Sequence, residues 1–193
     1  FFDKKILKSA SKFNSILGGH PEQNKVPGVE ASTGALGHGP AIGLGMAISS
    51  KLNKLKYKTF VVVGDGEINE GSFWETSMIA SKYNLNNFHV IIDYNKIQSY
   101  GRTKEILDLE PLNKKLQSFG YKVSEVNGHD IKQLNKYFKK IKKNIKKPTA
   151  LICHTIKGKG FPFAENNPYW HHKNFFTDKE VQEINKCLIR DKK

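Results

Sequence analysis

Residues 59–66 have the sequence TFVVVGDG, a continuous β-branched run that ends in Gly64-Asp65-Gly66. Such a run predicts a central strand of a parallel sheet, covered on both faces. Residues 88–97, FHVIIDYNKI, repeat this arrangement, because a second apolar run from Phe88 to Ile92 is followed by polar residues. In parallel sheets ligands bind beyond the carboxyl ends of the strands, so the segments that follow these two runs are the first places to search for a site.

Further strands and helices are predicted on either side of this pair. Apolar runs from Tyr121 to Val126 and from Thr149 to Thr155 predict a third and a fourth strand. Helices are expected at residues 3–17, from Ala41 to about Leu55, at 74–83, at 132–147 and after the capping-box sequence TDKE of residues 177–180. Because strands and helices alternate, the sequence predicts an α/β fold with a doubly wound, mostly parallel sheet and helices on both faces.

The helix expected from Ala41 has an unusual composition. Gly43, Gly45 and Ala47 alternate with larger apolar residues. This pattern predicts a helix that packs very close to a neighbour and is buried on both sides. No domain linker is visible, so residues 1–193 are expected to form a single domain.

Composition excludes several classes of protein. The chain has 193 residues, of which 38% are hydrophobic, so extensive disorder is not expected. No apolar run approaches the roughly 20 residues of a membrane helix. Cys153 and Cys187 lie 34 positions apart and form no close pair, which argues against a disulfide framework and against a zinc site. We therefore expect a soluble protein of the cytoplasm.

The formal net charge is +14, and many of the lysines lie between Lys132 and Lys147. Apolar residues recur there at spacings of three and four, which predicts an amphipathic helix whose lysines face water. A surface for nucleic acid is the alternative, although the sequence has no RNP-like aromatic pattern and no zinc finger. A noncatalytic basic domain that binds nucleic acid or a protein therefore stays open as a second function.

Two polar residues at the predicted strand ends suit a metal ion. Asp65 offers a carboxylate, and Asn95 follows it by thirty positions, one β-α-β crossover later. Adjacent parallel strands would bring the two together. Mg²⁺ prefers octahedral oxygen ligation by few protein groups plus phosphate oxygens, which Asp65, the amide oxygen of Asn95 and a carbonyl near Ile97 would supply.

These two segments resemble the thiamine-diphosphate signature, in which Gly-Asp-Gly is followed about thirty residues later by Asn. Neighbouring motifs make the resemblance one to transketolase: residues 18–22 (GGHPE), 27–30 (PGVE), 32–39 (STGALGHG), 64–71 (GDGEINEG) and 93–97 (DYNKI). Residues 157–160 (KGKG) and 165–171 (ENNPYWH) resemble the closing signature of the amino-terminal subunit of a split transketolase.

The resemblance implies a cofactor and a set of residues that hold it. The cofactor would be thiamine diphosphate with Mg²⁺ or Ca²⁺. Asp65, Asn95 and the carbonyl of Ile97 would bind the metal. The remaining cofactor-binding residues would be Gly34 and Gly66, which allow close approach of the backbone, Leu36 near the rings, and Gly64 and Glu67 beside the Gly-Asp-Gly turn.

The resemblance also implies catalytic residues, and each has a simpler interpretation. His20 and His171 match positions that contact substrate or diphosphate, but His20 could cap a turn and His171 could form a surface pair with His172. Glu70 matches a carboxylate at the subunit interface, but it could also complement a helix dipole. His89 and His129 are expected to be structural, whereas His38, His154 and the basic pair Lys157 and Lys159 stay open.

The implied activity is that of transketolase in the pentose phosphate pathway, the transfer of a two-carbon ketol unit from a ketose phosphate to an aldose phosphate. The implied partner is a pyrimidine-binding carboxy-terminal subunit, in a heterotetramer that also requires self-association. We expect the family's upstream segment, with a helix and a further substrate-binding histidine, to be missing here. Another thiamine-diphosphate transferase, either similar to deoxyxylulose-phosphate synthase or specialised for unusual sugars, is the alternative within the same chemistry.

Overall fold

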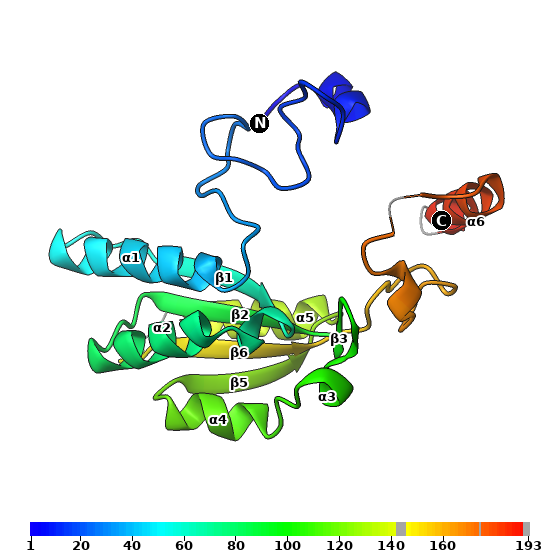
Figure 1. The fold of residues 1–193 in the computed structure, drawn as a ribbon. Coiled ribbons are helices and arrows are strands. Elements are labelled where there is room, and N and C mark those ends of the chain that lie inside the picture. The colour runs from blue at the N-terminus through cyan, green and yellow to red at the C-terminus, as the bar shows by residue number, and fades with distance from the viewer. Residues whose placement is uncertain (142–145, 174, 191–193) are drawn as a thin grey trace.

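A computed structural model describes residues 1–141, 146–173 and 175–190, and its centre is a four-stranded sheet (Figure 1). The strands are β1 (Thr59–Gly64), β2 (Phe88–Tyr94), β5 (Lys122–Asn127) and β6 (Thr149–His154). Their order is β1-β2-β6-β5, and every neighbouring pair is parallel. The predicted strands and the mostly parallel sheet are confirmed.

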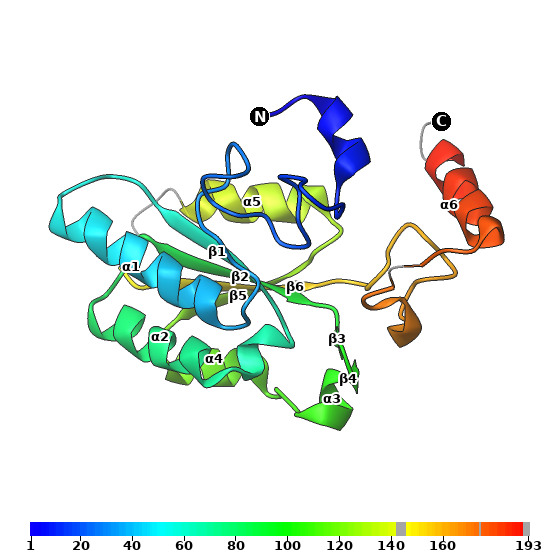
Figure 2. The same ribbon diagram turned by 45° about the horizontal axis from the view of Figure 1, so that its top comes forward.

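Helices cover both faces of this sheet, which confirms the doubly wound arrangement. On one face lie α1 (His38–Leu52), α2 (Gly71–Lys82) and α4 (Leu112–Ser118), and on the other lies α5 (Ile131–Ile141) (Figure 2). The predicted lysine-rich helix is described only as far as Ile141, so residues 142–145 lie outside the described part of the chain.

The smaller elements lie around the sheet. A two-stranded antiparallel pair follows β2, and the remaining elements are short helices except for the last one. They are η1 (Lys4–Ser9), η2 (Glu67–Asn69), β3 (Ile97–Gln98), β4 (Gly101–Arg102), α3 (Thr103–Ile106), η3 (Pro168–Trp170) and α6 (Asp178–Arg190). Along the described chain, no helix is both long enough and apolar enough to cross a membrane.

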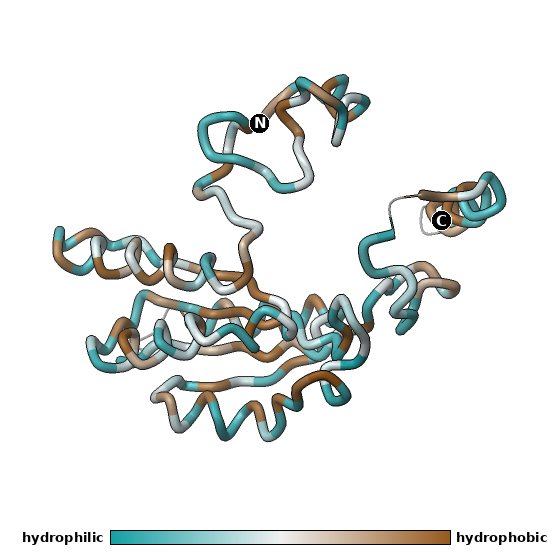
Figure 3. Tube along the Cα trace, in the orientation of Figure 1, coloured by the Kyte–Doolittle hydropathy of each residue, from teal (hydrophilic) through white to brown (hydrophobic). Residues whose placement is uncertain are grey.

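The apolar core lies between the sheet and the α1, α2 and α4 layer, where brown segments of strand and helix meet in Figure 3. Phe73, Phe88, Leu116 and Ile152 are fully buried in it. Burial of side chains of this size stabilises the fold by about 1.5–3 kcal/mol each. The core therefore fixes the position of the strand ends that carry the polar motifs.

Helix α1 approaches β1 as closely as its sequence predicts. A Cβ added to Gly43 would lie 2.4 Å from Cγ2 of Val61, so only glycine fits there without a shift. The predicted burial on both sides is wrong, because Gly43, Leu44 and Ala47 are buried whereas Ile42 is exposed. The helix forms an outer layer, and its second side lacks a covering element among the described residues.

Strand β1 is an edge strand, not the central strand that its apolar run predicts. Its side chains Phe60 and Val62 are 46% and 68% exposed, and Phe60 faces α5, where its ring centroid lies 6.0 Å from that of Phe138. Phe60 still stacks on His89 of β2, with ring centroids 4.9 Å apart. Among the described residues one helix covers only part of this face, and Phe60 and Val62 line a pocket together with residues of the loop between Glu30 and Leu36.

The predicted helix over residues 3–17 is also wrong. Only a 3-10 helix, η1, forms, and Ser11 and Asn14 have φ angles of 60° and 61°. Non-glycine residues in this left-handed region interrupt a helix. The closing helix is confirmed with its capping box, because Thr177 Oγ1 accepts from the Glu180 amide at 3.3 Å and Glu180 Oε2 accepts from the Thr177 amide at 2.9 Å.

Candidate active site

The carboxyl ends of β1 and β2 lie side by side, and Asp65 joins them. Gly64 is in register with Asp93, and the Asp65 amide donates to the Asp93 carbonyl at 3.2 Å. The Asp65 side chain is 1% exposed, and its carboxylate accepts a hydrogen bond from the Lys96 amide. Two motifs thirty positions apart in the sequence therefore meet at one edge of the sheet.

The turn that follows β2 directs polar atoms inward. Lys96 has a φ of 66°, which lets the backbone double back towards Asp65. The Asn95 side chain is buried, its Oδ1 accepts from the Ile97 amide at 3.0 Å, and its Nδ2 donates to Asp93 Oδ2 at 3.2 Å. A carboxamide oxygen has two lone pairs, so Oδ1 retains one for a further partner.

Burial makes the Asp65 carboxylate costly to ionise. Its pKa is raised to about 6, chiefly by desolvation and further by the charge of Asp93, whereas hydrogen bonds from the Lys96 and Gly66 amides and the charge of Lys157 lower it. A bound divalent cation would favour the ionised form. Within the described ranges, no three His, Cys, Asp or Glu side chains gather, so a cation here would rely on amide and main-chain oxygens and on its ligand.

The Gly-Asp-Gly turn has a neighbour that sequence reasoning missed. A Cβ added to Gly66 would lie 2.9 Å from Cβ of Gln98, so the Gln98 side chain lies directly against this glycine. Nε2 of Gln98 is buried and has no hydrogen-bond partner among the described residues. Its position directly after Ile97 was the only signal in the sequence.

A separate pocket of about 460 Å³ gathers several of the other predicted residues: His20, Gly34, Leu36 and Glu67. Gly34 has a φ of 127°, and a Cβ there would lie 2.7 Å from Cγ of His20, so the histidine ring packs on bare backbone. The pocket continues along α1 and β1 to Met46 and Phe60. Asp65 and Asn95 are not part of its lining, so the predicted residues form two adjoining groups.

Glu67 and Glu70 contact the loop that carries this second group. Glu67 Oε1 accepts from the Gly37 amide at 3.0 Å. Gly37 has a φ of 78°, and a Cβ there would lie 2.2 Å from Ser72 Oγ and 2.8 Å from Cβ of Glu70. Glu67 therefore supports the loop through the main chain, and Glu70 packs beneath it at the start of α2.

His171 lies beside the β3–β4 hairpin, which is where the Ile97 carbonyl is located. Its Nε2 is 3.2 Å from Ser99 Oγ, and Nε2 of His172 is 3.1 Å from the same hydroxyl. The two rings are 4.2 Å apart between centroids. Burial, and then the charges of Lys157 and His172, lower the pKa of His171. Ser99, in the turn between β3 and β4, therefore positions both histidines.

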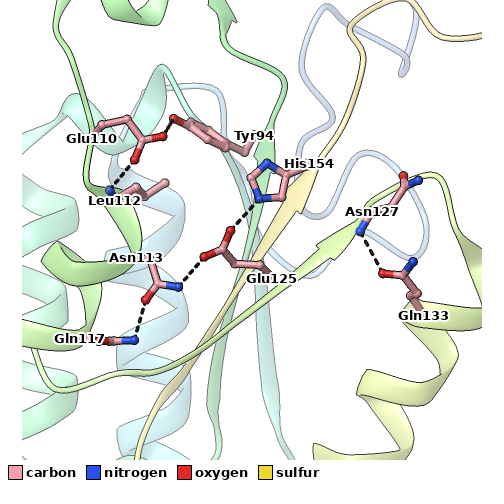
Figure 4. A network of polar contacts seen from close by, with 9 residues as sticks. All are labelled: Tyr94, Glu110, Leu112, Asn113, Gln117, Glu125, Asn127, Gln133 and His154. Atoms are coloured by element: carbon pink, nitrogen blue, oxygen red, sulfur yellow. Dashed lines mark hydrogen bonds and ion pairs between the residues drawn. The ribbon is translucent and has the colours of Figure 1, made fainter.

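Other candidate histidines have structural partners. His154 is hydrogen-bonded to Glu125, with 2.7 Å between Nε2 and Oε2, in the polar network of Figure 4 that also joins Glu125 to Asn113 of α4. Nδ1 of the buried His89 is 2.8 Å from Thr149 Oγ1, and Nε2 of His129 accepts from the Ile156 amide at 2.8 Å. The network of Figure 4 thus joins β5 and β6 to helix α4 through Glu125.

Comparison with known proteins identifies the family. Residues 2–192 match the family described as transketolase, thiamine diphosphate binding domain. The chain is 43% identical over 172 residues to an apulose-4-phosphate transketolase subunit of Phocaeicola vulgatus, a match that covers 89% of this chain and 61% of that protein. It is 33% identical over 172 residues to the 6-deoxy-6-sulfo-D-fructose transketolase subunit SqwG of a Clostridium species, covering 89% and 62%.

Solved structures agree with the sequence match. The transketolase of Pichia stipitis in complex with sedoheptulose-7-phosphate superposes with a TM-score of 0.85 and 28% identity, covering 95% of this chain and 29% of that one. The transketolase of Campylobacter jejuni has a TM-score of 0.80 and 30% identity, covering 86% and 27%. The chain spans about three fifths of the length of the curated subunits that it matches. With its parallel sheet, its Gly-Asp-Gly turn and its match over residues 2–192, this chain belongs to the transketolase thiamine diphosphate binding domain family.

Proposed function

We propose that the chain is the diphosphate-binding subunit of a split transketolase, which transfers a two-carbon ketol unit from a ketose phosphate to an aldose phosphate. The observation that supports this most is the hydrogen bond between the Asp65 carboxylate and the Lys96 amide, because it joins both halves of the signature at one place. Two relatives whose names describe transketolase subunits for a sugar or a sugar phosphate point in the same direction.

The residues present fit thiamine diphosphate with Mg²⁺. Asp65 is a buried carboxylate whose raised pKa a cation would lower, and Asn95 has an oxygen lone pair to spare. Asp65, Asn95 and the Ile97 carbonyl would hold the metal, with diphosphate oxygens completing its shell. Gly64 and Gly66 would let the diphosphate approach the main chain. Thiamine diphosphate supplies the nucleophilic carbon and the electron sink of the reaction.

The second group of residues, which lines the 460 Å³ pocket, would bind the rest of the cofactor and the sugar. Gly34 and Leu36 would contact the cofactor, and Glu67 would hold their loop through its bond to Gly37. His20 and His171 would hydrogen-bond the substrate or move protons on its hydroxyls. A lowered pKa keeps His171 neutral at physiological pH, the form that is able to accept a proton.

The partner would be a pyrimidine-binding transketolase subunit, and Glu70 would lie at the contact between subunits. A heterotetramer of two such pairs in the cytoplasm, acting in the pentose phosphate pathway or on a less common sugar phosphate, follows from this assignment. Names of relatives that refer to apulose-4-phosphate and a sulfo sugar favour, as the second candidate, a transferase specialised for a less common sugar.

The test is calorimetry of thiamine diphosphate with Mg²⁺ in the presence of a candidate partner subunit, for the wild type and for Asp65→Ala. Metal-dependent heat in the wild type that disappears in the variant would support the proposal. Absence of heat in the wild type, together with salt-sensitive DNA binding, would favour a noncatalytic basic domain instead. A panel of ketose and aldose phosphates would then separate the two transferase candidates.

A further inference from the structure

Gln98 has a buried hydrogen-bond donor that nothing in the described structure uses. Its Nε2 has no accessible surface and no partner in the described part of the chain. A buried donor without a partner is costly, and the great majority of buried polar groups in native proteins bond to protein, water or a ligand. The residue as a whole is half-buried, so its amide end is more deeply buried than the rest of it.

The position of Gln98 indicates what this partner is. The side chain lies against Gly66, where an added Cβ would be 2.9 Å from its Cβ and 3.2 Å from its Oε1. Ile97, the residue before it, is part of the turn that Asn95 closes. Gln98 is therefore the first side chain beyond the proposed metal site, on the rim of the Gly-Asp-Gly turn.

We infer that the carboxamide of Gln98 is a further binding group for the diphosphate, to which its Nε2 donates a hydrogen bond. The inference rests on the proposed function. In the structure Oε1, and not Nε2, is the amide atom nearest Gly66. The terminal torsion of glutamine is broad and roughly two-fold, so rotation about one bond exchanges the two atoms and brings Nε2 to the Gly66 side. A hydrogen bond to a charged oxygen is stronger than one to a neutral group, which gives the anionic ligand an advantage over water.

The experiment compares Gln98→Met and Gln98→Glu with the wild type. Methionine keeps the length of the side chain and removes the donor, whereas glutamate keeps the shape and adds a negative charge. Gln117→Met is the matched control, because Gln117 is exposed and its Nε2 already donates to Asn113. The probes are inorganic pyrophosphate with Mg²⁺ on the full chain, and thiamine diphosphate with Mg²⁺ on the chain with its partner subunit.

Both variants should weaken pyrophosphate binding, Gln98→Met by about 10- to 100-fold and Gln98→Glu by more, because the glutamate repels the anion. Thiamine diphosphate binding should weaken by the same factor. Without ligand, Gln98→Met should raise the thermal midpoint by roughly 3 °C or more, since the unpaired donor is gone. The control should change neither quantity in these directions.

The outcomes separate this inference from the proposed function. Pyrophosphate binding by the wild type with equal binding by Gln98→Met overturns the role of Gln98 and leaves the function standing. Retained binding in Gln98→Glu also overturns it, because it would mean that the carboxamide oxygen faces the metal. A wild type that binds neither probe overturns both the role of Gln98 and the function.

Discussion

The carboxylate of Asp65 accepts a hydrogen bond from the main-chain amide of Lys96, thirty-one positions further along the chain. This bond fastens the end of β1 to the turn that follows β2. Lys96 adopts a φ of 66° there, a conformation that costs a non-glycine residue free energy. The turn thus depends on its contact with Asp65.

Replacement of Asp65 should weaken cofactor binding and, in the absence of ligand, stabilise the fold. Asp65→Asn removes a charged metal ligand, and we expect Mg²⁺-dependent cofactor affinity to fall by about 100-fold or more. Mutation of residues that only hydrogen-bond a metal ligand already lowers metal affinity by about 10–100-fold. Without ligand, the pKa of Asp65 is about 6 in the folded chain, above the usual 3.8. The ionised carboxylate therefore destabilises the fold above pH 6, and this effect is absent below pH 4, where the carboxyl group is protonated in both states. The variant should therefore gain about 3 kcal/mol at pH 7. Urea titrations at pH 7 and pH 4 would measure this gain, and an equal effect at both values would contradict it.

His89 should make the chain less stable in acid. Desolvation and the charge of Lys58 lower its pKa to about 4, so below pH 6.5 the unfolded chain gains a proton that the folded chain does not. Between pH 6.5 and pH 4 this linkage should cost about 3 kcal/mol of unfolding free energy. His89→Gln should flatten this part of the stability profile. A profile that keeps its slope in His89→Gln would rule out this residue as the source.

Two glycines of α1 offer a matched pair. Gly43→Ala should destabilise the chain by about 1–3 kcal/mol, because the new Cβ meets Val61 at 2.4 Å. At Gly45 no described atom lies within 4 Å of an added Cβ, so Gly45→Ala should stabilise the helix by about 0.5–1 kcal/mol. Thermal unfolding of both variants checks the opposite signs. Equal effects would mean that α1 does not pack on β1 as described.

The hydroxyl of Ser99 should matter for turnover through His171. A hydroxyl has one proton, so it donates to one of the two imidazoles and accepts from the other. Removing it in Ser99→Ala should lower kcat by about tenfold with cofactor affinity unchanged, and Ser99→Thr should restore most of the rate. His171→Ala should lower kcat further. Steady-state kinetics with a pentose phosphate, on the chain together with its partner subunit, would show this. Unchanged rates in His171→Ala would return the histidine to a surface role.

Local sequence patterns predicted the strands because a β-branched run needs no knowledge of its neighbours. They could not predict that β1 lies at an edge, since strand order depends on pairings that no single run encodes. The segment at residues 3–17 has helical spacing, yet Ser11 and Asn14 adopt left-handed conformations. An apolar stripe forms a helix only when something covers it.

The part of the site at the ends of β1 and β2 was predictable, because both the residue types and the pairing of these two strands place metal-binding groups there. The thirty-residue interval between Asp65 and Asn95 predicted that the two segments would meet, because one crossover returns the chain to the adjacent strand. Gln98 and Ser99 could not be predicted, since their importance comes from contacts with Gly66 and His171 that lie far away in the sequence. Whether each residue binds cofactor or substrate stays a prediction.

The exposed flank of β1 has a practical consequence for handling the protein. In the described sheet β1 has a neighbouring strand on one side only, so its outer main-chain groups are a template onto which an extended segment from another molecule can add. We therefore expect concentrated solutions of the chain to self-associate through this edge.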